Sequence, residues 1–212
     1  MTYLLAPLIS LFIAGSPSPS VQKNEDISPL TDFSDEWNDP KYQVCNTAAE
    51  VEYLSDEEKN VIYILNLARY NPRLFANTVV KQYPEYNDNA ELINITYYQS
   101  LLTEMRGMKR LGLLKPDESC YISAECHAYN AGLSGAEGHV RTDSCSADQY
   151  YNGECCDYGH RDPLDIVMSL LIDYGVPSLG HRRICFNNYK FIGVAIQPHK
   201  RWDTNAVLDF HY

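Results

Sequence analysis

The sequence predicts a single globular domain that combines helices with a few strands. Helical spacing of apolar residues dominates from residue 55 to residue 174, and two short apolar runs suited to strands follow at 191–196 and 206–210. Hydrophobic residues make up 45% of the 212 residues and charged residues 21%, which is enough apolar material for a sizeable core. Because we find no repeat and no later domain boundary, we expect one domain over residues 51–212.

Residues that cap helices define the predicted helical segments. Ser55 is followed three residues later by Glu58, which is the spacing of a reciprocal N-terminal cap. Asn71, which stands before a proline, ends this helix and can start another, and Asp162 caps the clearest helix in the same way. Gly175 is expected to end that clearest helix. Shorter helices are expected at 101–111 and 116–132.

Two stretches lack a regular period and are expected to be loops. Residues 83–95 are polar, and residues 134–160 are rich in Gly, Asp, Ser and Cys. Long irregular connections often carry function, so the second stretch is a candidate functional region.

The N-terminal residues have the character of a targeting segment. Residues 4–14 form an apolar run as long as a signal-peptide core and too short to cross a bilayer as a helix. Small residues up to Ser20 suit cleavage, although no basic residue precedes the run. We expect a signal peptide over 1–20, with an uncleaved anchor or a buried element as the alternatives, and then a flexible tail over 21–50. The mature protein is expected to be secreted and to have no stable membrane span.

Charge excludes one class of partner. The formal net charge is -11 at pH 7, and no cluster of Lys and Arg offsets it locally. Such a chain repels phosphate backbones and anionic membrane surfaces, so we expect no nucleic-acid partner.

The seven cysteines point to an oxidising compartment. Structural disulfides are favoured over a metal cluster because the sequence contains no Cys-x-x-Cys pair. Spacing does not give the connectivity, and the odd number leaves at least one thiol unpaired. Asn94 begins the one clear glycosylation sequon, which would be used in a eukaryotic source.

Four side chains could together bind zinc or another divalent cation: His139, Glu154, Asp173 and His181. His139 and Glu154 each follow a glycine, which permits a close approach of the backbone to a site. Asp173 falls in the last turn of a predicted helix, where the helix dipole disfavours an acid, and His181 lies just beyond. Two imidazoles and two carboxylates suit such a cation. The spacing matches no short metal motif, and a solvated surface role for Asp173 is the alternative.

Other catalytic patterns are absent or weaker. The sequence has no Gly-x-Ser-x-Gly elbow and no His-Glu-x-x-His pair, and no local signature surrounds any cysteine. His127 lies on a helix among alanines, and His160 precedes a helix cap. Structural roles are the simpler interpretation for both histidines.

Five motifs in order resemble the CAP (cysteine-rich secretory, antigen 5, pathogenesis-related) family, especially its microbial members. The opening helix is similar to the family's LNxxRxxP start, and GH, GE and GHR resemble its histidine and acid motifs. The motifs are LNLARYNP at 65–72, AECHA at 124–128 with GH at 138–139, GE at 153–154, GHR at 180–182 and IGVA at 192–195.

The resemblance implies an α+β fold, a three-layer α-β-α sandwich with a central, mostly antiparallel sheet. It also implies that His139, Glu154, Asp173 and His181 form the family's cavity tetrad, although Asp173 replaces a usual Glu and Cys155 replaces the usual Asn after the Glu. Family members are linked to sterol and lipid binding, divalent-metal binding, defence or virulence secretion and occasionally proteolysis, with no shared reaction. We expect a secreted binding module. The alternatives are a metal-assisted hydrolase with Glu154 as general base and a structural module with a vestigial tetrad, which the Cys155-Cys156 pair favours.

Overall fold

The computed structural model describes residues 27–147 and 149–212, so the expected signal peptide lies outside the described residues. Within them the chain has an α+β fold with a four-stranded, mostly antiparallel sheet. The strands are β1 Lys115–Pro116, β2 Gly153–Tyr158, β3 Phe191–His199 and β4 Asp203–His211. Their order in the sheet is β1-β3-β4-β2. β1 pairs in parallel with β3, whereas β3 and β2 are both antiparallel to β4. The helices are α1 Asp56–Tyr70, α2 Pro72–Phe75, α3 Lys81–Tyr86, α4 Thr96–Gly107, α5 Glu118–Ser134, α6 Asp143–Ser146, α7 Pro163–Ile172 and α8 Gly180–Cys185.

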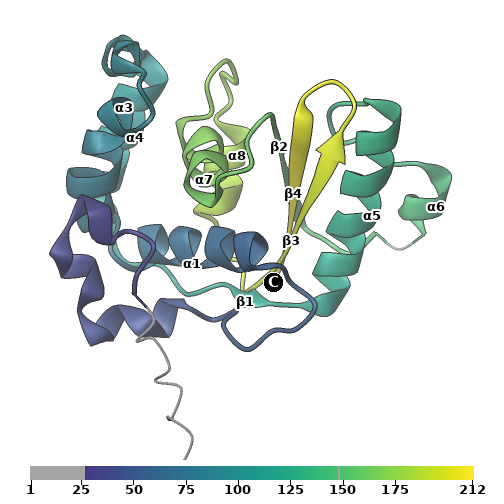
Figure 1. Ribbon diagram of the computed structural model, residues 1–212, viewed down its shortest axis with the longest axis horizontal. Helices are drawn as coiled ribbons and strands as arrows, with labels where there is room; N and C mark the ends of the chain where they lie inside the picture. The colour runs from purple at the N-terminus through teal and green to yellow at the C-terminus, as the bar shows by residue number, and fades with distance from the viewer. Residues whose placement is uncertain (1–26, 148) are drawn as a thin grey trace, which may run out of the picture.

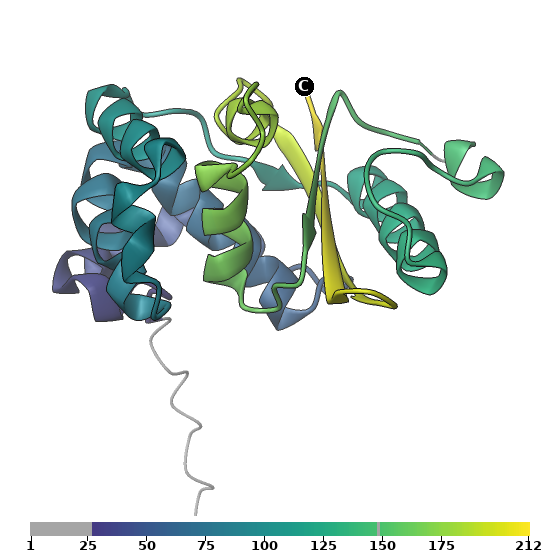
Figure 2. The ribbon, with the colours of Figure 1, turned by 90° about the horizontal axis from the view of Figure 1, so that it is seen from above.

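Helices lie on both faces of this sheet. α5 packs on β3 and β4 from one side, and α1, α7 and α8 lie on the other side, with α3 and α4 farther out (Figures 1 and 2). Between α5 and the sheet the buried residues are small, mostly alanines. Gly193 of β3 allows this close approach, because a Cβ there would lie 2.1 Å from the backbone nitrogen of Tyr121. The larger apolar core fills the opposite face.

The predicted caps are present. The Ser55 hydroxyl accepts a hydrogen bond from the Glu58 backbone N–H, and the Glu58 carboxylate accepts one from the Ser55 backbone N–H, which confirms the reciprocal cap of α1. Asn71 caps α2 and Asp162 caps α7 through side-chain oxygens, as expected. Within the described ranges, no helix combines the length and the apolar character that crossing a membrane requires.

The expected flexible tail needs a correction for residues 27–50. Three short 3₁₀ helices occupy Thr31–Phe33, Asp35–Asn38 and Pro40–Cys45. Trp37 is fully buried there, and its indole N–H donates a hydrogen bond to Thr78 at 3.1 Å. This burial makes the segment part of the folded domain.

The two expected loops also contain regular structure. Residues 83–95 contain the end of α3 and a 3₁₀ helix at Ala90–Asn94, and residues 134–160 contain α6 and the whole of β2. The residues of β2 are buried on both faces, so the strand shows no alternation of apolar and polar residues.

The cysteines form fewer bridges than expected. One disulfide joins Cys126 to Cys145, and the other five cysteines are buried thiols.

Candidate metal and ligand site

The structure brings the four expected site residues together as two pairs. His139 lies in the connection after α5 and places Nδ1 2.8 Å from Oε1 of Glu154 on β2. His181, in the first turn of α8, places Nδ1 2.8 Å from Oδ1 of Asp173. The two imidazole rings are neighbours, with centroids 6.2 Å apart and planes tilted by 47° to one another. Residues 42 positions apart in sequence therefore meet at one place.

Asp173 occupies a special backbone position. It is the residue after α7, in the left-handed region with φ of 56°. Its Oδ2 accepts hydrogen bonds from the backbone N–H of His181 at 3.0 Å and of Arg182 at 3.4 Å. The acid therefore does not lie in the last turn of α7, as expected from sequence, but satisfies free N–H groups at the start of α8. The alternative of a solvated surface acid is wrong, because Asp173 is buried.

Both pairs leave the same ring nitrogen available. A carboxylate beside Nδ1 favours the tautomer with the proton on Nδ1, so the lone pair of each ring lies on Nε2. The carboxylates are buried, whereas 56% of the His139 side chain and 23% of the His181 side chain are exposed. A histidine oriented by a carboxylate in this way is the usual ligand arrangement in zinc proteins.

A buried ionic network lies behind Glu154. The guanidinium of Arg141 contacts Oε2 of Glu154 and lies 2.8 Å from Oδ2 of Asp209 on β4. Ser123 of α5 donates a hydrogen bond to the same Asp209 oxygen at 2.6 Å, and its backbone carbonyl accepts one from Arg141. The ring of Tyr151 lies 4.6 Å from the guanidinium.

This network sets the protonation of the site. Burial raises the pKa of Glu154, but hydrogen bonding to His139 and the charge of Arg141 outweigh it, so its pKa lies below the usual value. The hydrogen bond to Glu154 raises the pKa of His139. Burial raises the pKa of Asp209 to about 7, against the opposing effect of Arg141. Glu154 is therefore ionised at neutral pH and a weak proton acceptor, which disfavours the role of general base in a hydrolase.

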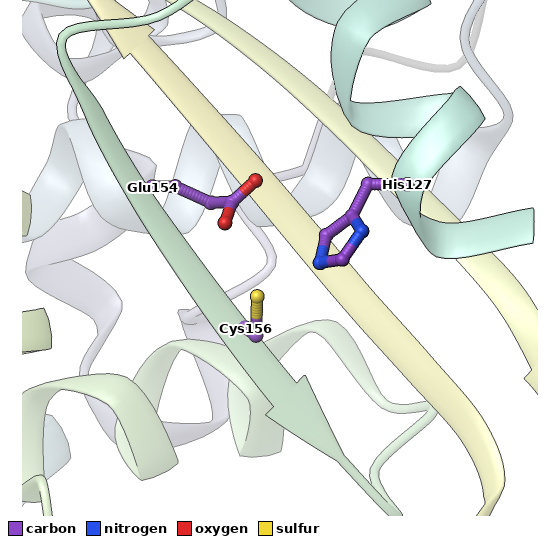
Figure 3. A group of neighbouring side chains, drawn as sticks. All are labelled: His127, Glu154 and Cys156. Carbon is purple, nitrogen blue, oxygen red and sulfur yellow. The ribbon is translucent and has the colours of Figure 1, made fainter. Parts of the chain in front are cut away.

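A second group of possible metal ligands shares Glu154. His127, Glu154 and Cys156 offer ligand atoms that all lie within 4.8 Å of one another, and the three side chains converge between α5 and β2 (Figure 3). Their composition and burial could hold a metal ion. Nε2 of His127, however, lies 2.9 Å from the carbonyl oxygen of Gly138, and both oxygens of Glu154 are already paired. Burial raises the pKa of the Cys156 thiol well above its usual value, and the charge of Glu154 adds to this. An ion there would have to replace these bonds and displace the thiol proton.

A cavity of about 540 Å³ adjoins the second pair. This volume is in the range of small-molecule sites. Asp173 and His181 line one part of the wall, together with Tyr158 of β2. The remaining wall is mixed. Tyr83, Leu92, Ile95, Leu170, Ile172 and Val176 give it an apolar part, and Asn87, Asn89, Asp157, His160 and Ser169 give it a polar part. The cavity can therefore take an apolar group beside the histidines.

A further carboxylate–histidine pair lines the same cavity. Nδ1 of His160 lies 3.0 Å from Oδ2 of the buried Asp157, so His160 has a partner that its place before a helix cap did not suggest. The hydrogen bond to Asp157 raises the pKa of His160, against the effect of burial.

The His160→Gln variant should lose stability relative to the wild type mainly at acidic pH. A histidine whose folded pKa is raised stabilises the protein fully below its unfolded value of 6.5, and this contribution is lost as the pH rises through the folded pKa. Because 39% of the side chain is exposed, we expect less than about 1 kcal/mol. Urea unfolding of both proteins at about pH 5.5 and about pH 8.5 measures the difference between their free energies of unfolding. An equal difference at both pH values would contradict the assignment.

Sequence reasoning missed Arg141 and Asp209. Asp209 had a visible signal, since it is a charged residue inside the apolar run of β4. Arg141 had no such signal in the sequence, because its partners come from β2, β4 and α5, which are separate segments of the chain.

No family model matches the chain, and no curated protein and no solved structure matches it either.

Proposed function

We propose that this protein is a secreted binding module that holds a divalent cation, zinc by ligand type, between His139 and His181. The observation that carries the proposal is the pair of neighbouring imidazoles, each with Nδ1 occupied by a buried carboxylate. At Zn–N distances of about 2.0–2.1 Å, two imidazoles on a tetrahedral zinc ion have their centres roughly 5 Å apart. The observed 6.2 Å means that the two rings would move about 1 Å closer when the ion binds. Glu154 and Asp173 would orient the ligands rather than bind the ion.

The adjoining cavity gives the module its second component. The apolar part of its wall suits the hydrocarbon part of a lipid or sterol, or an apolar side chain of a protein partner. The bound cation would lie at the cavity edge and contribute a positive charge for a polar group of that ligand.

Membership of the CAP family, with its three-layer sandwich, is part of the same proposal. The ordered motifs support it, and so do the helices on both faces of the sheet and the meeting of the four tetrad residues. The vestigial-tetrad alternative gains nothing from Cys155, because Glu154 keeps its contact with His139 despite the substitution.

Calorimetric titration of zinc into the chelator-treated mature protein tests the proposal. We expect one cation per chain, and His139→Ala and His181→Ala should each weaken binding at least about tenfold while the fold is retained. His211→Ala is the matched control, because His211 lies near the C-terminal end of β4 and outside both candidate groups.

Cys156→Ala decides between the two candidate positions. Unchanged zinc affinity in this variant supports the His139–His181 position. Loss of binding in Cys156→Ala with retention in His181→Ala would place the ion at His127, Glu154 and Cys156 instead. No binding in the wild type would refute the proposed function.

A further inference from the structure

Two of the five buried thiols lie on the packed elements β2 and α8. Cys155 is fully buried and Cys185 is 1% exposed, and the two side chains interact. The Cys155 thiol lies 3.7 Å from the carbonyl oxygen of His181. α8 packs directly against β2 at this point (Figure 1).

The two elements carry opposite halves of the candidate site. Glu154, which holds His139, precedes Cys155 on β2, and His181 lies one helical turn before Cys185 on α8. Within the described residues, no other thiol is as well placed for Cys155. Cys156 points to the opposite face of the strand, toward α5, because successive strand residues alternate in direction.

We propose that Cys155 and Cys185 form a second disulfide, which joins β2 to α8 and fixes the spacing between the His139–Glu154 and Asp173–His181 pairs. The effect on cation binding rests on the proposed function, whereas the bridge itself does not.

The bond forms by exchange with a disulfide donor, either a small-molecule disulfide or a thiol oxidoreductase in its disulfide form. The thiolate of one cysteine attacks a donor sulfur, which forms a mixed disulfide and releases one donor thiol. The thiolate of the second cysteine then attacks the first cysteine's sulfur and releases the second donor thiol. The two cysteine protons end on the two released thiols, and the donor disulfide accepts the two electrons.

Burial determines when this exchange takes place. Both side chains are at most 1% exposed, so a disulfide donor does not reach either sulfur once the protein has folded. The bridge therefore forms while the chain folds in an oxidising compartment, and it then resists reduction by added thiols. This makes it a permanent cross-link rather than a reversible switch.

Counting thiols tests the bridge without any substitution. The full chain, produced in an oxidising compartment, is denatured without reductant, alkylated and weighed. Of seven cysteines, we expect three alkylated ones, Cys45, Cys120 and Cys156, and a Cys155–Cys185 cross-linked peptide after proteolysis. Five alkylated thiols, or a cross-link of Cys155 to another cysteine, would overturn the proposal.

Variants distinguish failure of the bridge from failure of the cation site. Cys185→Ser should release Cys155 and raise the count to four, whereas the matched control Cys156→Ser keeps the bridge and lowers it to two. The double variant Cys155→Ser with Cys185→Ser should unfold roughly 5–10 °C below the wild type. It should also bind zinc roughly two- to thirtyfold more weakly. A count of three with unchanged zinc affinity would retain the bridge and refute its effect on spacing, and a wild type that binds no zinc leaves the thiol count decisive for the bridge.

Discussion

Replacement of Arg141 by Met should lower the free energy of unfolding by about 3–5 kcal/mol, since it leaves two buried carboxylates without their cation. Arg141 contacts Glu154 and Asp209, and the side chains of all three residues are at most 2% exposed. Methionine keeps most of the apolar volume, so the loss reports on charge rather than on a cavity. Urea unfolding followed by circular dichroism measures it.

The pH dependence of this loss follows from Asp209. Its raised pKa costs the wild type stability as the pH rises from the unfolded value of 3.8 to about 7, and nothing more above that. Without Arg141 the pKa rises further, so the variant continues to lose stability above pH 7. The difference between the two proteins should therefore grow from about pH 7 to about pH 9.

The matched control combines Arg141→Met with Asp209→Asn. Asparagine has the shape of aspartate without its charge, so the double variant should recover part of the stability that Arg141→Met loses. A loss below about 1 kcal/mol in the single variant, or no recovery in the double variant, would show that the network contributes little.

Asp173→Asn should weaken zinc binding by roughly 10–100-fold with little effect on the fold. The amide lacks the negative charge of the Asp173 carboxylate. That charge orients the His181 ring and raises the basicity of its Nε2. Asparagine tolerates the left-handed backbone at φ of 56°, and its oxygen can still accept a hydrogen bond at the start of α8. Calorimetric titration gives the affinity, and the unfolding temperature checks the fold.

Asp157→Asn is the control for this experiment. It makes the same change in the other carboxylate–histidine pair of the cavity, with His160, which has no part in the proposed cation position. Zinc affinity should be unchanged there. Equal affinities for Asp173→Asn and the wild type would mean that Asp173 does not position a ligand.

Local chemistry was predictable from the sequence. The caps at Ser55, Asn71 and Asp162 depend on residues within three positions, so spacing alone predicts them. The two short apolar runs near the C-terminus were also local signals, and they predicted strands. The structure extends these strands to β3 and β4. His139, Glu154 and His181 were predicted through the order of motifs, and Asp173 from its place near the end of a predicted helix.

What sequence reasoning missed depends on partners far along the chain. β2 contains Glu154 and Asp157, which are buried because His139, Arg141 and His160 pair with them, so its sequence does not resemble a strand. The segment around Trp37 has isolated apolar residues without a period. It is ordered because it packs against helices that follow it in the chain. Neither feature has a local signal.

The Cys126–Cys145 bridge restricts the chain segment that carries His139. It closes a chain segment of 19 residues that contains both His139 and Arg141. A closed segment samples fewer conformations than an open one, so the His139 imidazole, half exposed as it is, starts close to the arrangement that a cation requires. This segment then loses less conformational entropy when a cation binds. Protein made in a reducing cytoplasm would lack this restraint, so its affinity for a cation is expected to be lower than that of protein with the bridge.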